Sequence, residues 1–342
     1  MPTDIVIDMG SKKTVLYSNN RVVLMQPSVV TVDAETFEPK FFGDKAQQTV
    51  GRTPDSLTPV FPIAHGVIAD YEIAETMLKT YMAQVFGNRV VKPRAIITLP
   101  SGLTEMQHHS VSDVAESAGG RNASTIESPL ASALALGIDF KKPKGAMIID
   151  IGAGVTDIAT ISMGGISQCN TVGIAGNDFD ESIVKYVKRK HKILIGPSTA
   201  EKIKMAIGSA TRHDFEIALT AKGRQISSGL PTTFEMTSLE IYEAIKEHLA
   251  EILNAVKKVL QSTPPDIVGD IMKDGIYLTG GSAKLRGLDM FLENSLGAKV
   301  IVPEDPEFTA VKGAALALKT PEMLKNNDFF FRSVQKLKID LE

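Results

Sequence analysis

The chain has 342 residues, of which 43% are hydrophobic and 23% are charged, the composition of a globular protein large enough for two domains. A formal net charge of −3 argues against a general nucleic-acid-binding protein, which would carry an excess of basic residues. One cysteine, Cys169, excludes an internal disulfide framework, and without a visible leader or an apolar run of the ~18 residues that a bilayer requires we expect a cytosolic protein.

The first predicted element is a β-hairpin at residues 4–18, DIVIDMGSKKTVLYS. An apolar strand ends at Asp8, Gly10 allows a tight turn, and a second strand with β-branched residues follows. A buried strand that ends in a carboxylate, a glycine and hydroxyl groups indicates that something polar is held at its end.

Further along the chain, predicted helices and strands alternate. Apolar residues at helical spacing predict helices at 70–86, 104–119 and 127–136, the second of them capped by Thr104, and prolines bound a predicted strand at 93–100. This alternation is typical of α/β domains.

Residues 146–162, AMIIDIGAGVTDIATIS, repeat the first hairpin. Their first aspartate, first glycine and first threonine each follow the corresponding residue of that hairpin by 142 positions without a gap. The pairs are Asp8 with Asp150, Gly10 with Gly152, and Thr14 with Thr156. Two matched hairpins, each opening one half of the chain, predict two similar domains.

Two further features lie in the second half of the chain. A long amphipathic helix is predicted at 238–260, before TPP at 263–265, and a third glycine turn lies in GIYLTGGSAKLRG, residues 275–287. Glycines in such a turn let the backbone approach a ligand closely. Because no long linker divides the chain, we expect the two halves to form one rigid body around a ligand-binding cleft.

The two matched hairpins suggest a polyphosphate ligand. If they face each other, their backbone N–H groups could hold phosphates from both sides, assisted by the hydroxyls of Ser11, Thr14 and Thr156. Carboxylates repel phosphate, so Asp8 and Asp150 would act through a divalent cation, usually Mg²⁺ with bound water. The alternative is that each aspartate only hydrogen-bonds its own turn.

Six segments of the chain resemble those of one known family. They are IDMGS (7–11), IESPLASALALG (126–137), IDIGAGVTDIATI (149–161), GIAGNDFDESI (173–183), TAEKIKMAIGSA (199–210) and LTGGSAKLRGLD (278–289). Together they resemble the MreB family of bacterial actins, within the actin-like ATPase superfamily, and the resemblance extends over residues 4–317.

The resemblance implies an α/β fold with duplicated actin-like (ribonuclease-H-like) domains around a nucleotide cleft, each with a smaller subdomain. The implied division assigns 1–31, 65–142 and 318–342 to domain IA, 32–64 to subdomain IB, 143–178 and 248–317 to domain IIA, and 179–247 to subdomain IIB.

The resemblance also places ATP or ADP with Mg²⁺ in the cleft. The residues that would bind the nucleotide are Asp8, Gly10, Ser11, Lys12, Lys13, Thr14, Gly152, Ala153, Gly154, Val155, Glu201, Lys204, Gly280, Gly281 and Ser282. Among them, Asp8 and Asp150 would hold Mg²⁺ through water, and Glu201 and Lys204 would contact ribose and adenine. Other interpretations stay open: Ser198 and Glu201 have the spacing of a capping box, and Lys204 or either loop lysine could face solvent.

Glu127, Asp150 and Thr156 are the catalytic residues that the resemblance implies, with Glu127 orienting the attacking water. A structural alternative makes Glu127 the N-terminal residue of its helix, where the helix dipole stabilises a carboxylate. Several positions depart from the family pattern: Ser128 replaces a second glutamate, lysines replace small residues at 12 and 13, Val155 replaces threonine, and His65 replaces aspartate. These departures bear on the rate of hydrolysis more than on binding.

As a member of this family the protein would polymerise with itself into antiparallel paired protofilaments that support cell shape, and paralogous bacterial actins could be further partners. It would lie in the cytoplasm, peripheral to the inner face of the membrane, and would not bind nucleic acid. Segment 85–91 could insert into lipid or connect a helix to a strand, and the tail with Phe329–Phe331 could anchor the protein or pack against the first domain. The alternative function is a nucleotide-binding filament scaffold with little or no hydrolysis.

Overall fold

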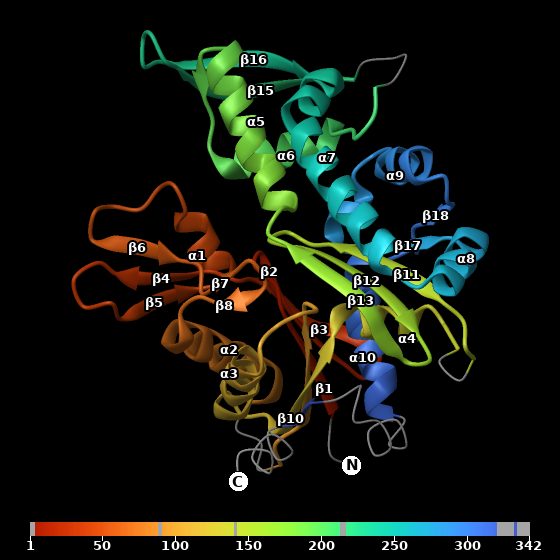
Figure 1. Ribbon diagram of the computed structural model, residues 1–342. Coiled ribbons are helices and arrows are strands. Elements are labelled where there is room, and N and C mark those ends of the chain that lie inside the picture. Colours follow the sequence, from red (N-terminus) through yellow and green to blue (C-terminus); the bar gives the residue numbers. More distant parts are fainter. Residues whose placement is uncertain (1–3, 88–90, 140–141, 213–216, 320–331, 334–342) are drawn as a thin grey trace.

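The computed structural model describes residues 4–87, 91–139, 142–212, 217–319 and 332–333. Figure 1 shows two α/β halves, one built mainly from the N-terminal residues with the blue C-terminal helix beside its sheet, and the other from residues in between. Each half has a large sheet near the centre of the molecule and a smaller sheet farther out.

The first large sheet has six strands in the order β19-β10-β9-β1-β2-β3. Their bounds are β1 (Asp4–Met9), β2 (Lys13–Ser18), β3 (Arg21–Pro27), β9 (Arg94–Leu99), β10 (Arg121–Glu127) and β19 (Arg332–Ser333). Alternate residues of β1 enter different cores, because side chains point to opposite faces along a strand. Ile5 and Ile7 pack with helices α2 (Tyr71–Phe86) and α3 (Glu105–Ser117), whereas Val6 belongs to a core on the other face.

The second large sheet repeats the central hairpin of the first. Its strand order is β13-β12-β11-β17-β18, with β11 (Ala146–Ile151), β12 (Thr156–Ser162), β13 (Gly165–Val172), β17 (Ile276–Thr279) and β18 (Val300–Ile301). As β1 does with β2 and β9, β11 pairs antiparallel with β12 and parallel with β17. Met147 and Ile149 face a core that includes the long helix α7 (Ser238–Ser262), and Ile148 faces the opposite side.

Two helices join the halves. α4 (Ser128–Ala135) and α10 (Thr309–Lys319) pack against each other, and their core contains Val6 from one sheet and Ile148 from the other. Gly313 marks the closest approach, since a Cβ added there would lie 1.6 Å from the carbonyl oxygen of Ala131. The two sheets therefore share one hydrophobic core through a pair of helices rich in small residues.

The outer parts are smaller sheets with their own helices. In the first half they comprise β4 (Val30–Asp33), β5 (Pro39–Phe42), β6 (Leu57–Val60), the hairpin β7 (Ile63–Ala64) and β8 (Val67–Ile68), and α1 (Asp44–Thr49). In the second half they comprise β14 (Ile193–Leu194), β15 (Ala218–Gln225), β16 (Pro231–Thr237), α5 (Gly176–Lys190) and α6 (Pro197–Ile207). Among the described residues, the remaining helices are α8 (Pro265–Asp274), α9 (Leu288–Leu296) and the short 3₁₀ turns η1 (Gly281–Lys284) and η2 (Pro306–Phe308).

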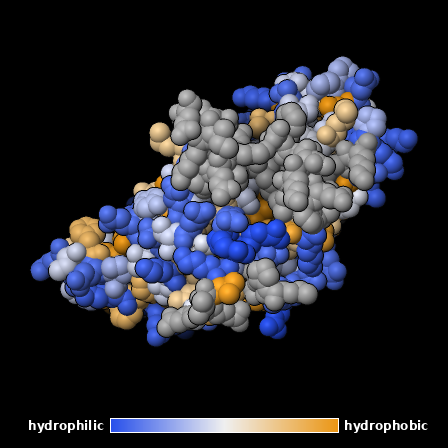
Figure 2. Space-filling model, turned by 90° about the horizontal axis from the view of Figure 1, so that it is seen from below, coloured by the Kyte–Doolittle hydropathy of each residue, from blue (hydrophilic) through white to orange (hydrophobic). Residues whose placement is uncertain are grey.

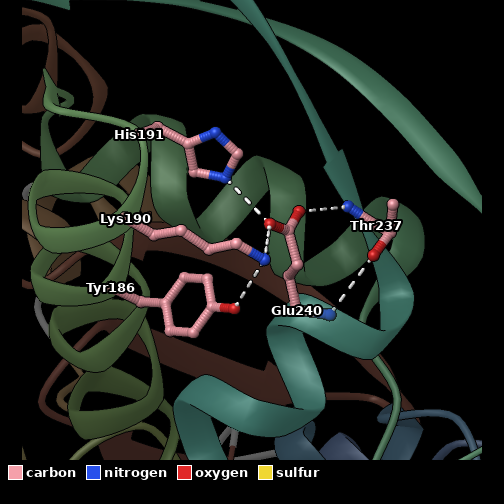
Figure 3. Close-up of polar contacts among 5 residues, drawn as sticks. All are labelled: Tyr186, Lys190, His191, Thr237 and Glu240. Carbon is pink, nitrogen blue, oxygen red and sulfur yellow. Dashed lines mark hydrogen bonds and ion pairs between the residues drawn. The ribbon is translucent and has the colours of Figure 1, made fainter.

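A buried carboxylate links α5 to α7 in the outer part of the second half (Figure 3). Glu240 lies 2.7 Å from the ammonium of Lys190 and 2.9 Å from Nε2 of His191, and it accepts the backbone N–H of Thr237 at 3.0 Å. The Thr237 hydroxyl accepts the N–H of Glu240, which completes a capping box at the start of α7.

The elements expected from the sequence are present, with end points shifted by a few residues. α2, β9, α3, α4 and α7 correspond to the predicted segments, and Thr104 caps α3 as expected. The third glycine turn follows β17 and leads into η1.

Candidate functional site

A cavity of about 590 Å³ lies between the two halves. Both hairpin turns line it, together with η1 and with residues of α5 and α6. The first half and the second half therefore each contribute one wall, and the two matched sequence motifs meet at one site.

The two turns have the same backbone geometry. The N–H of Gly10 donates to the carbonyl of Lys13 at 3.0 Å, and the N–H of Gly152 donates to the carbonyl of Val155 at 3.0 Å. In the same way Met9 faces Thr14, and Ile151 faces Thr156, across their hairpins. The repeat read from the sequence is thus a repeat in three dimensions.

The aspartates at the strand ends also occupy matched positions. Asp8 lies opposite Thr98 on β9, and Asp150 lies opposite Thr279 on β17. Burial raises the pKa of Asp8 to about 6, against a smaller lowering by the Thr98 hydroxyl. Burial, followed by the nearby charges of Asp157 and Asp8, raises the pKa of Asp150 to about 7.

Asp157 is a third carboxylate in the cavity wall, and sequence reasoning gave it no role. It accepts the backbone N–H of Ser101 at 2.7 Å, a bond that joins the two halves, and within its own half it accepts the hydroxyl of Thr171 at 2.9 Å. Burial raises its pKa to about 6, although these hydrogen bonds favour the charged form. The sequence contains one indication of a separate role for Asp157: the repeat aligns it with apolar Val15, so this carboxylate is not part of the repeated pattern.

The donor set fits a cation that is shared with a ligand. Among the residues that the structure describes, no group of three or more His, Cys, Asp or Glu side chains is arranged to hold a metal ion. Asp8 and Asp150 are nevertheless close enough for their charges to interact, and a cation between them would offset the cost of ionising both. Mg²⁺ is commonly held in this way, by one or two carboxylates with phosphate oxygens and water.

The hydroxyls expected to face phosphate do not all point into the cavity. Thr14 and Thr156 are fully buried and are not among the lining residues. Thr14 Oγ1 lies 2.9 Å from Ser28 Oγ, and Thr156 Oγ1 donates to the carbonyl of Ile174 at 2.6 Å. These two threonines stabilise the turns through hydrogen bonds to other protein groups, whereas Ser11 lines the cavity.

The two turns touch each other at Ser11 and Gly154. A Cβ on Gly154 would lie 2.2 Å from Ser11 Oγ, so only glycine permits this approach. Beside this contact, Nδ1 of His65 lies 3.2 Å from the carbonyl oxygen of Gly154, and the N–H of Gly66 donates to Ser11 Oγ at 3.3 Å. The β7–β8 turn therefore holds both phosphate-loop candidates.

Four charged side chains form a cluster on the cavity wall. Lys12 Nζ lies 2.8 Å from Glu201 Oε2, and Lys204 Nζ lies 2.8 Å from Asp180 Oδ1 and 2.6 Å from the carbonyl oxygen of Gly176. Burial lowers the pKa of Lys204 and raises that of Asp180, against their mutual attraction. Asp180 was missed by sequence reasoning, since it joins the cluster only through packing of α5 on α6.

The structural alternative for Glu201 is wrong. α6 begins at Pro197 with Gly196 as its N-cap, and no side chain caps it. Ser198 and Glu201 therefore do not form a capping box, and the Glu201 side chain belongs to the cavity wall.

The third glycine turn is fixed against the second hairpin. Gly280 has a φ of +86°, and a Cβ there would lie 2.4 Å from the carbonyl oxygen of Ile151. The Ser282 hydroxyl donates to the carbonyl of Gly152 at 2.7 Å. Gly280, Gly281 and Ser282 all line the cavity, as do Ala153 and Val155 of the second turn.

Comparison with known proteins decides the family. The MreB/Mbl protein family model matches residues 2–326. The chain belongs to the MreB/Mbl family. Over 94% of its length it is 38% identical both to the cell shape-determining protein Mbl of Bacillus cereus, covering 97% of that protein, and to the cell shape-determining protein MreB of Escherichia coli, covering 94%.

A solved structure extends the comparison to three dimensions. MreB5 of Spiroplasma citri, crystallised with ADP, superposes with a TM-score of 0.89 at 32% identity, and the match covers 96% of this chain and 99% of that one. The predicted α/β fold of duplicated actin-like domains is thereby confirmed for this MreB/Mbl chain.

Glu127 occupies the N-cap position of α4 in this MreB/Mbl protein, without a side-chain cap bond. Its charge contributes to the raised pKa of Asp157, which shows that the two carboxylates are near each other. The next residue, Ser128, lines the cavity, but Glu127 is not one of the lining residues. The catalytic assignment of Glu127 stays a prediction.

Proposed function

We propose that this protein binds Mg-ATP in the cavity, polymerises into paired antiparallel protofilaments and slowly hydrolyses ATP to ADP and phosphate in support of cell shape. The observation that carries the proposal is the pair of matched turns, Gly10–Lys13 and Gly152–Val155, on facing walls of one cavity. The relatives named as cell shape-determining proteins and the neighbour bound to ADP support it.

In this proposal the two turns hold the phosphates with their backbone N–H groups, and Lys12 and Lys13 add positive charge. Asp8 and Asp150 would hold Mg²⁺ through water, and the ion would neutralise part of the phosphate charge. Gly280, Gly281 and Ser282 line the adenosine, and Glu201 with Lys204 binds the nucleoside. Thr14 and Thr156 keep both turns in shape through their buried hydroxyls.

Hydrolysis requires a polar side chain that aligns water with the terminal phosphate, because phosphoryl transfer needs mainly positioning and electrostatic stabilisation. We assign this role to Glu127, at the junction of β10 and α4. One observation favours the alternative, a nucleotide-binding filament scaffold with little hydrolysis: Ser128, not Glu127, is the residue of this pair that lines the cavity.

We further propose that the chain divides into domains IA, IB, IIA and IIB with the boundaries expected from the sequence. The strands of the six-stranded sheet fall within the residues assigned to IA, and those of the five-stranded sheet fall within IIA. α10 crosses this division: most of its residues are assigned to IIA, but it packs against β1, β2 and β9 of the six-stranded sheet.

Association with the cytoplasmic face of a membrane is part of the proposal. No helix among the described residues has the length and apolar character needed to cross a bilayer. Of segment 85–91, Val85 and Phe86 pack against the core, Val91 is 61% exposed, and residues 88–90 lie outside the described residues, as does the tail with Phe329–Phe331. On the face in Figure 2, the visible described residues are mainly hydrophilic, with hydrophobic residues in small separate areas.

High-speed pelleting with phosphate release measured in the same tubes tests the proposal. We expect more protein in the pellet with Mg-ATP than with Mg-ADP or without nucleotide, together with phosphate release. Glu127→Ala should slow release at least about tenfold, because a positioned polar group is lost, while assembly persists.

Two other results of the pelleting assay would change the proposal. Pelleting without phosphate release would establish the scaffold alternative. A protein that binds no nucleotide and stays in the supernatant in every tube, with or without lipid vesicles, would overturn the proposed function.

A further inference from the structure

Lys12 makes an ion pair across the cavity. It lies in the turn between β1 and β2, in the first half, whereas Glu201 on α6 and Asp180 on α5 belong to the second half. Its ammonium is 2.8 Å from Glu201 Oε2 and 3.7 Å from Asp180 Oδ2. This ion pair joins the first phosphate-loop candidate to the wall assigned to the nucleoside.

The other anion of this cluster already has a dedicated cation. Lys204, with a side chain only 14% exposed, lies 2.8 Å from Asp180 Oδ1 and donates to the carbonyl of Gly176. Among the described residues, Lys12 is the cation within ion-pair distance of Glu201, whereas the charge of Lys204 reaches Glu201 only from farther away. With side chains 31% and 29% exposed, Lys12 and Glu201 form a solvent-screened pair that a competing ligand can separate.

A bound polyphosphate is such a competitor. The turn that carries Lys12 is the same turn whose N–H groups would hold phosphate, and a lysine is a flexible point charge that can reach either anion. Glu201 would in turn become free to accept hydrogen bonds from a nucleoside hydroxyl.

We propose that Lys12 exchanges Glu201 for phosphate oxygens when a nucleotide binds, so that nucleoside recognition by Glu201 depends on the phosphates. Lys12 is then a specificity-determining residue that discriminates against unphosphorylated nucleosides. The inference rests on the proposed function, since it requires nucleotide in the cavity.

Calorimetric titration of the full chain with ADP and with adenosine tests the exchange. The variants are Lys12→Met, Glu201→Gln and their combination, with Lys202→Met as the control, because Lys202 is exposed on the same helix and does not line the cavity. Circular dichroism verifies that each variant is folded.

The test compares the effect of Lys12→Met on ADP affinity in wild type with its effect in the Glu201→Gln background. In an exchange, part of the affinity that Lys12 gains from phosphate is offset by the ion pair that it gives up. Lys12→Met should therefore weaken ADP binding severalfold more in the Glu201→Gln background than in wild type, and it should tighten adenosine binding. The control should bind both ligands as wild type does.

An equal effect of Lys12→Met in both backgrounds, or a larger effect in wild type, would overturn the exchange, because it would mean that the ion pair is absent or persists in the complex. If wild type binds ADP in that experiment, the proposed function stands and only the role of Lys12 fails. If wild type binds neither ADP nor ATP, the proposed function fails first, and the inference fails with it.

Discussion

At the scale of single residues, buried charges are tolerated where each has specific partners. Glu240 shows this outside the cavity, in the cluster of Figure 3. Burial alone would raise its pKa, but the hydrogen bonds from Lys190 and Thr237 outweigh it, and the pKa lies below the usual 4.5. Its charged form is therefore the form that stabilises the link between α5 and α7.

The pH dependence of stability follows from this pKa shift. Because the folded pKa of Glu240 is lowered, its contribution is present above pH 4.5 and is lost as the pH falls through the folded value. We expect Glu240→Gln to lower the free energy of unfolding by about 1–3 kcal/mol at pH 7, and the difference from wild type should shrink below pH 4.5. Urea denaturation at several pH values measures it.

The control for this prediction is Glu247→Gln, on the exposed face of the same helix, which should leave the unfolding curve unchanged. A loss that stays constant from pH 7 to pH 4 would show that Glu240 contributes through packing and not through its charge.

At the scale of elements, the contact of α4 with α10 depends on small side chains. Gly313 on α10 lies against the backbone of Ala131 and Ala135 on α4, beside the core shared by the two sheets. Side chains of this size allow the helix backbones to approach closely, and the sheets can then pack from both sides.

Gly313→Ala should therefore destabilise the protein, although alanine is the better helix former. The added Cβ would lie 1.6 Å from a backbone carbonyl oxygen, so the helices must separate, and we expect a loss of about 1–3 kcal/mol. The matched substitution Gly269→Ala, in α8 with no atom within 4 Å of the new Cβ, should raise stability by up to about 1 kcal/mol. Urea denaturation compares the two, and a neutral Gly313→Ala would contradict the close packing.

At the scale of the whole molecule, the shared core and the hydrogen bonds of Asp157 couple the two halves. A ligand between the halves that binds only the folded state would stabilise both of them. The cavity therefore links nucleotide binding to the unfolding of the entire chain.

We accordingly expect Mg-ADP at one hundred times its Kd to stabilise the protein by about 2.7 kcal/mol, seen as an upward shift of one thermal transition. Removing Mg²⁺ with EDTA should reduce the shift, and Asp8→Asn or Asp150→Asn should make the remaining shift insensitive to EDTA. A full shift in EDTA would show that ADP binds without a cation at these carboxylates.

Sequence alone determined the two hairpins, their register and the fold. Turn chemistry is local, because an Asp-x-Gly turn between apolar strands closes within a few residues. The same residues recur 142 positions later, and they form the same turn in the second half. The family resemblance added the arrangement of the halves, which the comparisons confirmed.

Only the tertiary structure decided which side chains face the cavity and which form hydrogen bonds inside the protein instead. A threonine hydroxyl can bond a ligand or another group of the protein with the same sequence around it. Here packing directs Thr14 to the hydroxyl of Ser28 and Thr156 to the carbonyl of Ile174, away from the cavity. Asp157 and Asp180 acquired their partners from segments distant in the chain. Such contacts depend on how separate elements pack, and no local pattern encodes that packing.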